Sequence, residues 1–354
     1  MLLYKLEHLF EINNSLLTYI RNSLANRTFR VTIGSSASKL YKVLSGVPQG
    51  GVLSPLLFTL FVNDLPDFIT PSCLVLQYAD DVKLISTCTD PDTIKDTLSI
   101  AISRLNEWCI KWHLRLNPKK SKICYFTKSN HDKNNPKSLK CNNTEIPYVN
   151  TVKDLEVWFD SKITFENHTT RLLKSLRTSL GMFWRNLTPI RGTNAIRTAF
   201  HALVQSQIDY GLPIWGIAAP THLHAIEATH RKFLRFILNI PHDDHTQSYE
   251  ELTQAAKTFT LQSRYEYLTL NLAHTLVNHL PSLTNLSLTR ANSQRSTRSH
   301  TRYYILFFRL DSTRRSFLYI TPHILNLLVE DLDLVSIPKH IFKKLLKEFL
   351  LDSI

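Results

Sequence analysis

The stretch QYADDVKLIST, residues 77–87, places two adjacent carboxylates, Asp80 and Asp81, inside an otherwise apolar run. The apolar residues around the pair are typical of a buried strand: Leu74, Val75, Leu76, Tyr78, Val82, Leu84 and Ile85. One interpretation is a tight surface hairpin, because Asp is a frequent turn former. The other is a metal site, because paired carboxylates on a rigid turn offer oxygen ligands to hard divalent cations. On these residues alone both interpretations stand.

Upstream of this run, the segment GVPQGGVLSPLLFTLFVNDLP, residues 46–66, concentrates three of the chain's eight glycines within six residues. Ser54 is a good N-cap and Pro55 suits a first helical turn, so we expect a helix that begins there and ends before Pro66. Its apolar side chains should point inward: Leu56, Leu57, Leu60 and Phe61. The glycine loop then opens onto a helix N-terminus, where backbone amides can approach a phosphate or a base pair. A P-loop is excluded because no Lys-Ser or Lys-Thr follows the glycines.

Three further segments of the first half have a recognisable pattern. FRVTIG, residues 29–34, alternates like a strand and ends at Gly34, which predicts a hairpin. Residues 91–113 have apolar positions at helical spacing. LNPKKSK, residues 116–122, forms a basic turn whose lysines either contact phosphate or are solvated.

The second half has an almost wholly helical pattern from Thr164 to about Leu280. Within it, residues 165–187 place an apolar stripe opposite a basic one formed by Arg171, Lys174, Arg177 and Arg185. The apolar stripe indicates a core, while the basic stripe is either a solvated face or a surface that follows a nucleic-acid backbone. Residues 281–302, rich in Ser, Thr, Asn and Arg, are typical of a basic linker before a last helix.

Composition limits the partner and the compartment. The 354 residues carry 42 Lys and Arg against 29 Asp and Glu, a net charge of +13 that favours nucleic acid as partner. The five cysteines are odd in number and form no CxxC pair, so we expect free thiols in a reducing compartment. The longest apolar run is broken by Ser54 and Pro55 and is too short to span a bilayer. These patterns predict a soluble intracellular protein, nuclear or cytoplasmic and without a membrane partner; no specific protein partner is indicated.

Taken together, GVPQGGVLSPLLFTLFVND and YADD, about thirty residues apart, resemble motifs of the reverse transcriptases of non-LTR retrotransposons, above all the jockey-like group. Pro48, Gln49 and Gly50 are similar to the family's Pro-Gln-Gly segment, which contacts nucleotide and template. LNPKKSK resembles the motif that supplies an Asn and a Lys near the incoming triphosphate, here Asn117 and Lys120.

The resemblance implies an α+β fold. We expect a partial right-hand polymerase palm, an antiparallel sheet with helices on one face, followed by an all-helical thumb and a C-terminal helical region. The implied domains are a partial palm at 1–150, a palm–thumb junction and thumb helix at 151–190, a helical region at 191–280, and a basic linker with a helical tail at 281–354.

The resemblance also implies a reaction, RNA-directed DNA synthesis by two-metal nucleotidyl transfer. Asp80 would bind both Mg²⁺ ions directly, and Asp81 would be a weaker or indirect ligand. RNA template, DNA primer and dNTP would be the partners, and Arg171, Lys174 and Arg177 would contact the nucleic-acid backbone.

Two departures from the family limit this expectation. The family's first catalytic aspartate lies just before a helix that begins like LLYKLEHLF, and LLYKL here begins at residue 2. We therefore expect an N-terminally truncated polymerase without that strand or the fingers, whose remaining carboxylates bind Mg²⁺ weakly. The alternative is a catalytically inactive retroelement remnant that only binds nucleic acid. The family also has an aromatic residue and a glycine where this chain has Asp154 and Glu156.

Overall fold

The structure is a computed structural model that describes residues 1–69, 73–88, 90–127, 138–241, 244, 246–279, 317–328 and 337–352. The chain divides into two compact units, one of residues 1–123 and 129–148 and one of residues 124–128 and 149–354. The predicted linker at 281–302 lies outside the described residues.

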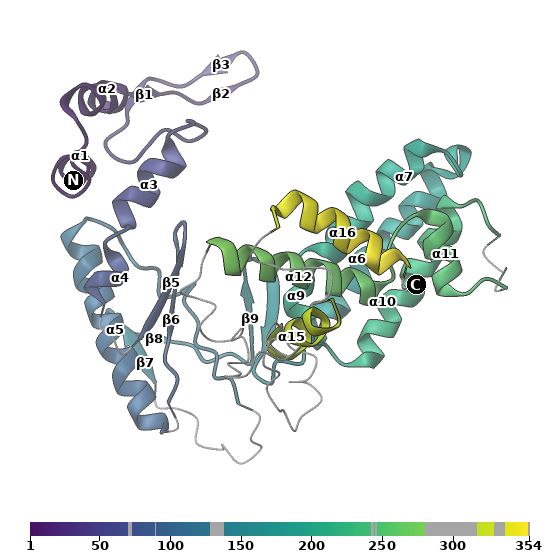
Figure 1. Ribbon diagram of the computed structural model, residues 1–354. Helices are drawn as coiled ribbons and strands as arrows, with labels where there is room; N and C mark the ends of the chain where they lie inside the picture. The colour runs from purple at the N-terminus through teal and green to yellow at the C-terminus, as the bar shows by residue number, and fades with distance from the viewer. Residues whose placement is uncertain are drawn as a thin grey trace. The chain divides into compact units, whose positions relative to one another are not determined.

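The first unit combines helices with short antiparallel strand pairs (Figure 1). Its helices are α1 (Leu2–His8), α2 (Asn14–Leu24), α3 (Ser54–Val62), α4 (Leu65–Phe68) and α5 (Pro91–Lys111). Its strands are β1 (Thr28–Phe29), β2 (Thr32–Ile33), β3 (Ser36–Ala37), β4 (Tyr41–Lys42), β5 (Leu74–Tyr78), β6 (Asp81–Ile85), β7 (Leu139–Cys141) and β8 (Thr144–Ile146).

Helix α5 is the structural centre of this unit. Asp90 caps it by accepting the Thr93 backbone N–H at 2.9 Å, and Pro91 occupies the first helical turn, where a missing N–H costs nothing. Ala101, Leu105 and Trp108 on its inner face pack with residues of α3, α4 and the β5–β6 hairpin. The helix predicted at residues 91–113 is confirmed.

The second unit is mainly helical. It begins with the hairpin β9 (Thr151–Asp154) and β10 (Val157–Asp160). Its helical segments are α6 (Glu166–Asn186), η1 (Thr188–Ile190), α7 (Asn194–Phe200), the π-helical η2 (His201–Gln205), α8 (Ser206–Asp209), α9 (Leu212–Trp215), α10 (Pro220–Ile237), α11 (Tyr249–Ala256), α12 (Leu261–His279), α15 (Phe317–Leu328) and α16 (Lys339–Asp352).

An aromatic core holds the second unit together. Phe183 of α6 meets Phe233 and Phe236 of α10 edge-on, with ring centroids 5.3 and 5.8 Å apart, a favourable geometry for aromatic pairs. Gly211 lets the chain pass close to the β9–β10 hairpin, because a Cβ there would lie 2.9 Å from Val157 Cγ2. The helical pattern predicted from Thr164 onward is confirmed in the described residues.

The strands differ from the predicted sheet in one respect. They pair antiparallel, as expected, but within the described ranges they form five separate two-stranded ladders rather than one sheet. In particular, no third strand hydrogen-bonds to either edge of β5–β6 in the described part of the chain. None of the described helices is both long and apolar enough to cross a membrane. All five cysteines are free thiols.

Candidate active site and nucleic-acid-binding surface

The paired aspartates lie at the tip of the β5–β6 hairpin. Tyr78 pairs with Asp81 in the ladder, so Ala79 and Asp80 form a two-residue turn. Ala79 has a φ of 50°, the left-handed conformation that such hairpin turns require and that costs a residue with a Cβ about 1–2 kcal/mol. Asp80 and Asp81 are both exposed, so the turn presents two carboxylates side by side to solvent.

Only one face of this hairpin is packed. Val75, Val82 and Leu84 lie against the core built around α5, whereas Leu74 and Tyr78 on the other face are 57% and 64% exposed. The run was typical of a buried strand, and this is wrong for the face that carries Leu74 and Tyr78. A continuous apolar run is typical of a strand covered on both faces, but the described residues cover only one face.

The two carboxylates alone do not fit a two-metal site. In the ranges that the structure describes, no cluster of three or more His, Cys, Asp or Glu side chains is placed to hold a metal ion. Two divalent cations next to two carboxylates would carry twice the compensating negative charge and would repel each other. A third oxygen ligand from outside these residues would be needed.

The Pro-Gln-Gly segment forms a tight turn before α3. The Gly51 N–H donates to the Pro48 carbonyl at 3.2 Å, and Gly50 has a φ of +80°, the conformation that the third residue of a type II turn requires. The Ser54 hydroxyl donates to the same Pro48 carbonyl and closes the loop onto the helix. Gln49 is exposed and available to a ligand.

Two details of α3 differ from the sequence prediction. Ser54 does not cap the helix with its side chain, because its hydroxyl is engaged by Pro48 and Leu53 occupies the N-cap position. Leu56 is 56% exposed rather than inward, whereas Leu57 on the same turn is buried.

The turn with Asn117 and Lys120 is held by one carbonyl. Asn117 O accepts the backbone N–H groups of Lys120 and Ser121, each at 3.1 Å, and the Ser121 hydroxyl at 3.0 Å. The Asn117 and Lys120 side chains are exposed. The Asn117 turn, the Pro-Gln-Gly loop and the paired aspartates belong to the same unit. The hydrogen bonds of the Asn117 turn and of the Pro-Gln-Gly loop lie within each segment and do not involve Asp80.

Sequence reasoning missed a buried lysine in the same unit. Lys5 of α1 is fully buried, forms an ion pair with Asp64, and donates to the Phe61 carbonyl at 2.7 Å. Its ammonium lies 3.8 Å from the Trp112 ring centroid and 4.6 Å from that of Trp108. Burial lowers the pKa of Lys5, and the hydrogen bond and charge of Asp64 partly oppose this. The two tryptophans four residues apart, Trp108 on α5 and Trp112 at its C-cap, were the available signal.

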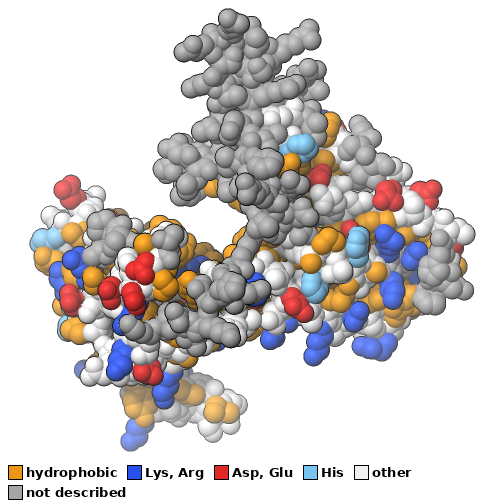
Figure 2. Space-filling model, turned by 90° about the horizontal axis from the view of Figure 1, so that it is seen from below, with side chains coloured by type: hydrophobic (Ala, Val, Ile, Leu, Met, Phe, Trp, Pro, Cys, Tyr) orange, Lys and Arg blue, Asp and Glu red, His pale blue; other side chains and the backbone are white. Residues whose placement is uncertain are grey.

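A second candidate surface runs along α6. Arg171, Lys174 and Arg177 are exposed, as the opposing stripes predict. Arg171 stacks on Trp158 of β10, with its guanidinium carbon 4.2 Å from the ring centroid. Figure 2 shows Lys and Arg side chains gathered along one margin of the helical second unit.

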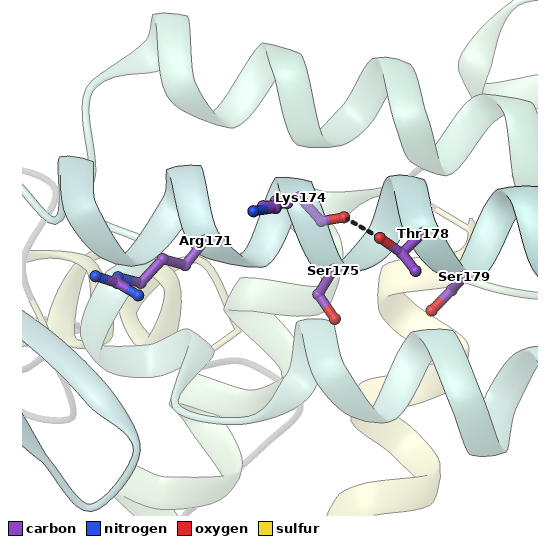
Figure 3. Close-up of a pocket in the computed structure, with 5 residues that line it drawn as sticks. All are labelled: Arg171, Lys174, Ser175, Thr178 and Ser179. Carbon is purple, nitrogen blue, oxygen red and sulfur yellow. Dashed lines mark hydrogen bonds between the residues drawn. The ribbon is translucent and has the colours of Figure 1, made fainter.

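A shallow open groove follows the same helix (Figure 3). It is lined by Arg171, Lys174, Ser175, Thr178 and Ser179. The Ser175 hydroxyl donates to Gln207 Oε1 at 2.7 Å, and the Thr178 hydroxyl donates to the Lys174 carbonyl at 3.0 Å. These two hydroxyl protons are therefore engaged within the protein, and it is the charge of Arg171 and Lys174 that suits the groove to phosphate oxygens.

Comparison with known proteins shows which family the first half of the chain matches. Residues 3–172 match the model of the family described as "Reverse transcriptase (RNA-dependent DNA polymerase)". The chain is 30% identical over 251 residues to the RNA-directed DNA polymerase from mobile element jockey of Drosophila funebris, which covers 68% of this chain and 26% of that protein. It is 28% identical over 225 residues to the probable RNA-directed DNA polymerase from transposon X-element of Drosophila melanogaster, covering 62% of this chain and 24% of that protein. The chain thus spans about a quarter of the length of these curated relatives.

Proposed function

Because residues 3–172 belong to the reverse transcriptase family, we propose that the chain is part of an RNA-directed DNA polymerase of a non-LTR retroelement. The observation that supports this most is the β5–β6 turn, which presents Asp80 and Asp81 on a hairpin braced from one side by α5. In this proposal β5–β6 is the palm hairpin and α6 is the first thumb helix. The substrates are an RNA template, a DNA primer and a dNTP.

Each remaining motif has a role in the proposal. The turn at Pro48, Gln49 and Gly50 positions the templating base and the nucleotide, since glycine permits close approach of the backbone. Asn117 and Lys120 lie near the triphosphate, where the exposed lysine offers a positive charge to phosphate oxygens. Arg171, Lys174 and Arg177 contact the nucleic-acid backbone.

Mg²⁺ is the cofactor of this proposal, and the chain needs a further ligand to bind it. Because Asp80 and Asp81 do not fit a two-ion site alone, a third carboxylate must come from outside the described residues. This gives a specific reason for the second candidate function, in which the chain binds nucleic acid through the α6 surface and performs no synthesis.

Primer extension separates the two functions. The purified 354-residue chain is incubated with an RNA template, a DNA primer, dNTPs and Mg²⁺, beside the variants Asp80→Asn and Asp81→Asn. Glu145→Gln is the matched control, since this exposed carboxylate lies on β8 of the same unit. The polymerase proposal expects Asp80→Asn to reduce extension at least about 100-fold, as losing a group that stabilises transition-state charge does, with Glu145→Gln unaffected.

Two results would count against polymerase activity. Equal extension by the wild type and Asp80→Asn would show that the β5–β6 turn takes no part in the reaction. No extension by any form, together with RNA binding that weakens with salt and is unchanged in Asp80→Asn, would establish the binding function instead.

A further inference from the structure

Residues 27–43 form an arm that has no core of its own. Every residue from Thr28 to Lys42 is exposed. Two short ladders, β1–β4 and β2–β3, build the arm, and the Val43 N–H donates to the Arg27 carbonyl at 2.9 Å at its base. Figure 1 shows this hairpin reaching away from α2 and α3. A lone two-stranded hairpin is only marginally stable in water, so this arm needs a partner to be ordered.

One face of the arm displays an aromatic pair. Phe29 and Tyr41 are direct cross-strand partners with ring centroids 5.7 Å apart, and they are 51% and 53% exposed. Alternation along β1 and β2 adds Val31 and Ile33 to this face. Exposed aromatic rings on a strand surface are the platform on which proteins stack bases of single-stranded nucleic acid.

Positive charge lies at the base of the arm and on the face opposite the rings. Residues 12–63 contain five basic side chains and no Asp or Glu: Arg21, Arg27, Arg30, Lys39 and Lys42. Arg27 fixes the base of the arm by donating to the carbonyls of Leu24 and Gly46. Lys42 stands opposite Thr28, on the side away from the rings, and alternation places Arg30 on that side too. These charges disfavour a second copy of the chain as occupant, because a twofold contact would bring identical cations together.

We propose that the arm of residues 27–43 binds single-stranded nucleic acid, stacking bases on Phe29 and Tyr41 while Arg30 and Lys42 attract phosphates. The proposal rests on the proposed polymerase function, because it assigns the arm to the template strand. It concerns a surface distinct from the β5–β6 turn and from α6, so it can be tested separately.

The test is fluorescence anisotropy of the full chain with a labelled single-stranded RNA, and with a DNA of the same sequence. All proteins carry Asp80→Asn, so the outcome does not depend on catalysis. Phe29→Ala/Tyr41→Ala should weaken binding by about tenfold or more per ring, whereas the exchange Phe29→Tyr/Tyr41→Phe should keep wild-type affinity. Phe29→Leu/Tyr41→Leu should weaken binding as alanine does, because leucine is apolar but cannot stack.

Charge gives an independent readout. Arg30→Gln/Lys42→Gln should reduce the slope of log K against log salt by about 1.4, since each phosphate contact on a single strand contributes about 0.7. The variant Arg171→Gln/Lys174→Gln measures, by the same salt slope, the contribution of the α6 surface. Because the arm contributes nothing to a core, thermal unfolding should be unchanged in every arm variant, which excludes misfolding as a cause.

Two outcomes would overturn the proposal. One is wild-type affinity and salt slope in both the ring and the charge variants. The other is a concentration-dependent dimer, seen by sedimentation, that Phe29→Ala/Tyr41→Ala dissociates without changing RNA affinity.

Discussion

The hairpins β5–β6 and β9–β10 both turn through two residues, and both turns contain a non-glycine residue with positive φ. The turn residues are exposed in both hairpins, Leu155 and Glu156 in one and Ala79 and Asp80 in the other, but the turns differ in what holds them. At the β9–β10 turn, the Tyr210 hydroxyl donates to the Leu155 carbonyl at 2.7 Å, and Val157 beside the turn is buried in the aromatic core of its unit. At the β5–β6 turn, Tyr78, Asp80 and Asp81 are all exposed.

This difference indicates which turn is available for chemistry. The β9–β10 turn is held by Tyr210 and by the buried Val157, so its Leu155 carbonyl already has a hydrogen-bond partner within the protein. A turn with two solvated carboxylates, braced only from below, is free to meet a ligand.

The Lys5–Asp64 ion pair joins α1 to the start of α4 in the first unit. Asp64→Asn should lower the free energy of unfolding of the first unit by about 3 kcal/mol, because it leaves a buried ammonium without its counter-charge. The double variant Lys5→Met/Asp64→Asn should recover most of this loss, since it removes the buried charge. Urea unfolding followed by tryptophan fluorescence measures both. A double variant no more stable than Asp64→Asn would show that the pair does not act through its charge.

The stability of the second unit should decrease at acidic pH because of His230. Burial lowers the pKa of this histidine from 6.5 to about 4, and its Nδ1 lies 2.8 Å from the Tyr249 hydroxyl. Between pH 6.5 and pH 4 this histidine is protonated in the unfolded chain but stays neutral in the folded chain. Stability is therefore full above pH 6.5 and falls by up to about 3 kcal/mol as the pH approaches 4.

The control for this pH effect lies on the same helix. His230→Gln should flatten the dependence of the urea midpoint on pH in this window, whereas His224→Gln should not, because the His224 side chain is 73% exposed. Identical slopes in the two variants would mean that burial of His230 does not cause the effect.

The β9–β10 hairpin should become locally less stable when the hydrogen bond from Tyr210 is removed. Tyr210→Phe deletes the bond to the Leu155 carbonyl and should cost about 1 kcal/mol of local stability. Hydrogen exchange should then rise in β9 and β10 and stay unchanged in β5 and β6. Equal exchange in β9–β10 of the wild type and the variant would show that Tyr210 does not hold the turn.

The smallest effect comes from the turn residues themselves. Glu156 has a φ of 66°, and Ala79 has a φ of 50°. Glu156→Gly and Ala79→Gly should each stabilise the chain by about 0.5 kcal/mol, because relief of left-handed strain exceeds the entropy that glycine loses on folding. Thermal denaturation of the two variants tests this, and destabilisation by either would show that the side chain contributes more than its strain costs.

The sequence identified the elements better than their surroundings. Helical spacing located α5 and α6, and the adjacent Asp80 and Asp81 located the hairpin turn, because these signals are local. The open face of β5 was not predictable, since Leu74 and Leu76 look the same in a sequence whether or not a neighbour covers them. The Lys5–Asp64 pair, 59 residues apart, was missed because burial of a lysine depends on partners that local patterns do not reveal.

The central claim is that the β5–β6 turn offers two carboxylates and needs a third ligand to hold metal. Titration of the chain with Mn²⁺ as a probe, followed by isothermal calorimetry, tests it directly beside Asp80→Asn. We predict weak binding, with a dissociation constant on the order of a millimolar or higher, that is weaker still in Asp80→Asn. Tight binding of two ions per chain that Asp80→Asn abolishes would contradict the account, because the chain would then hold a complete site.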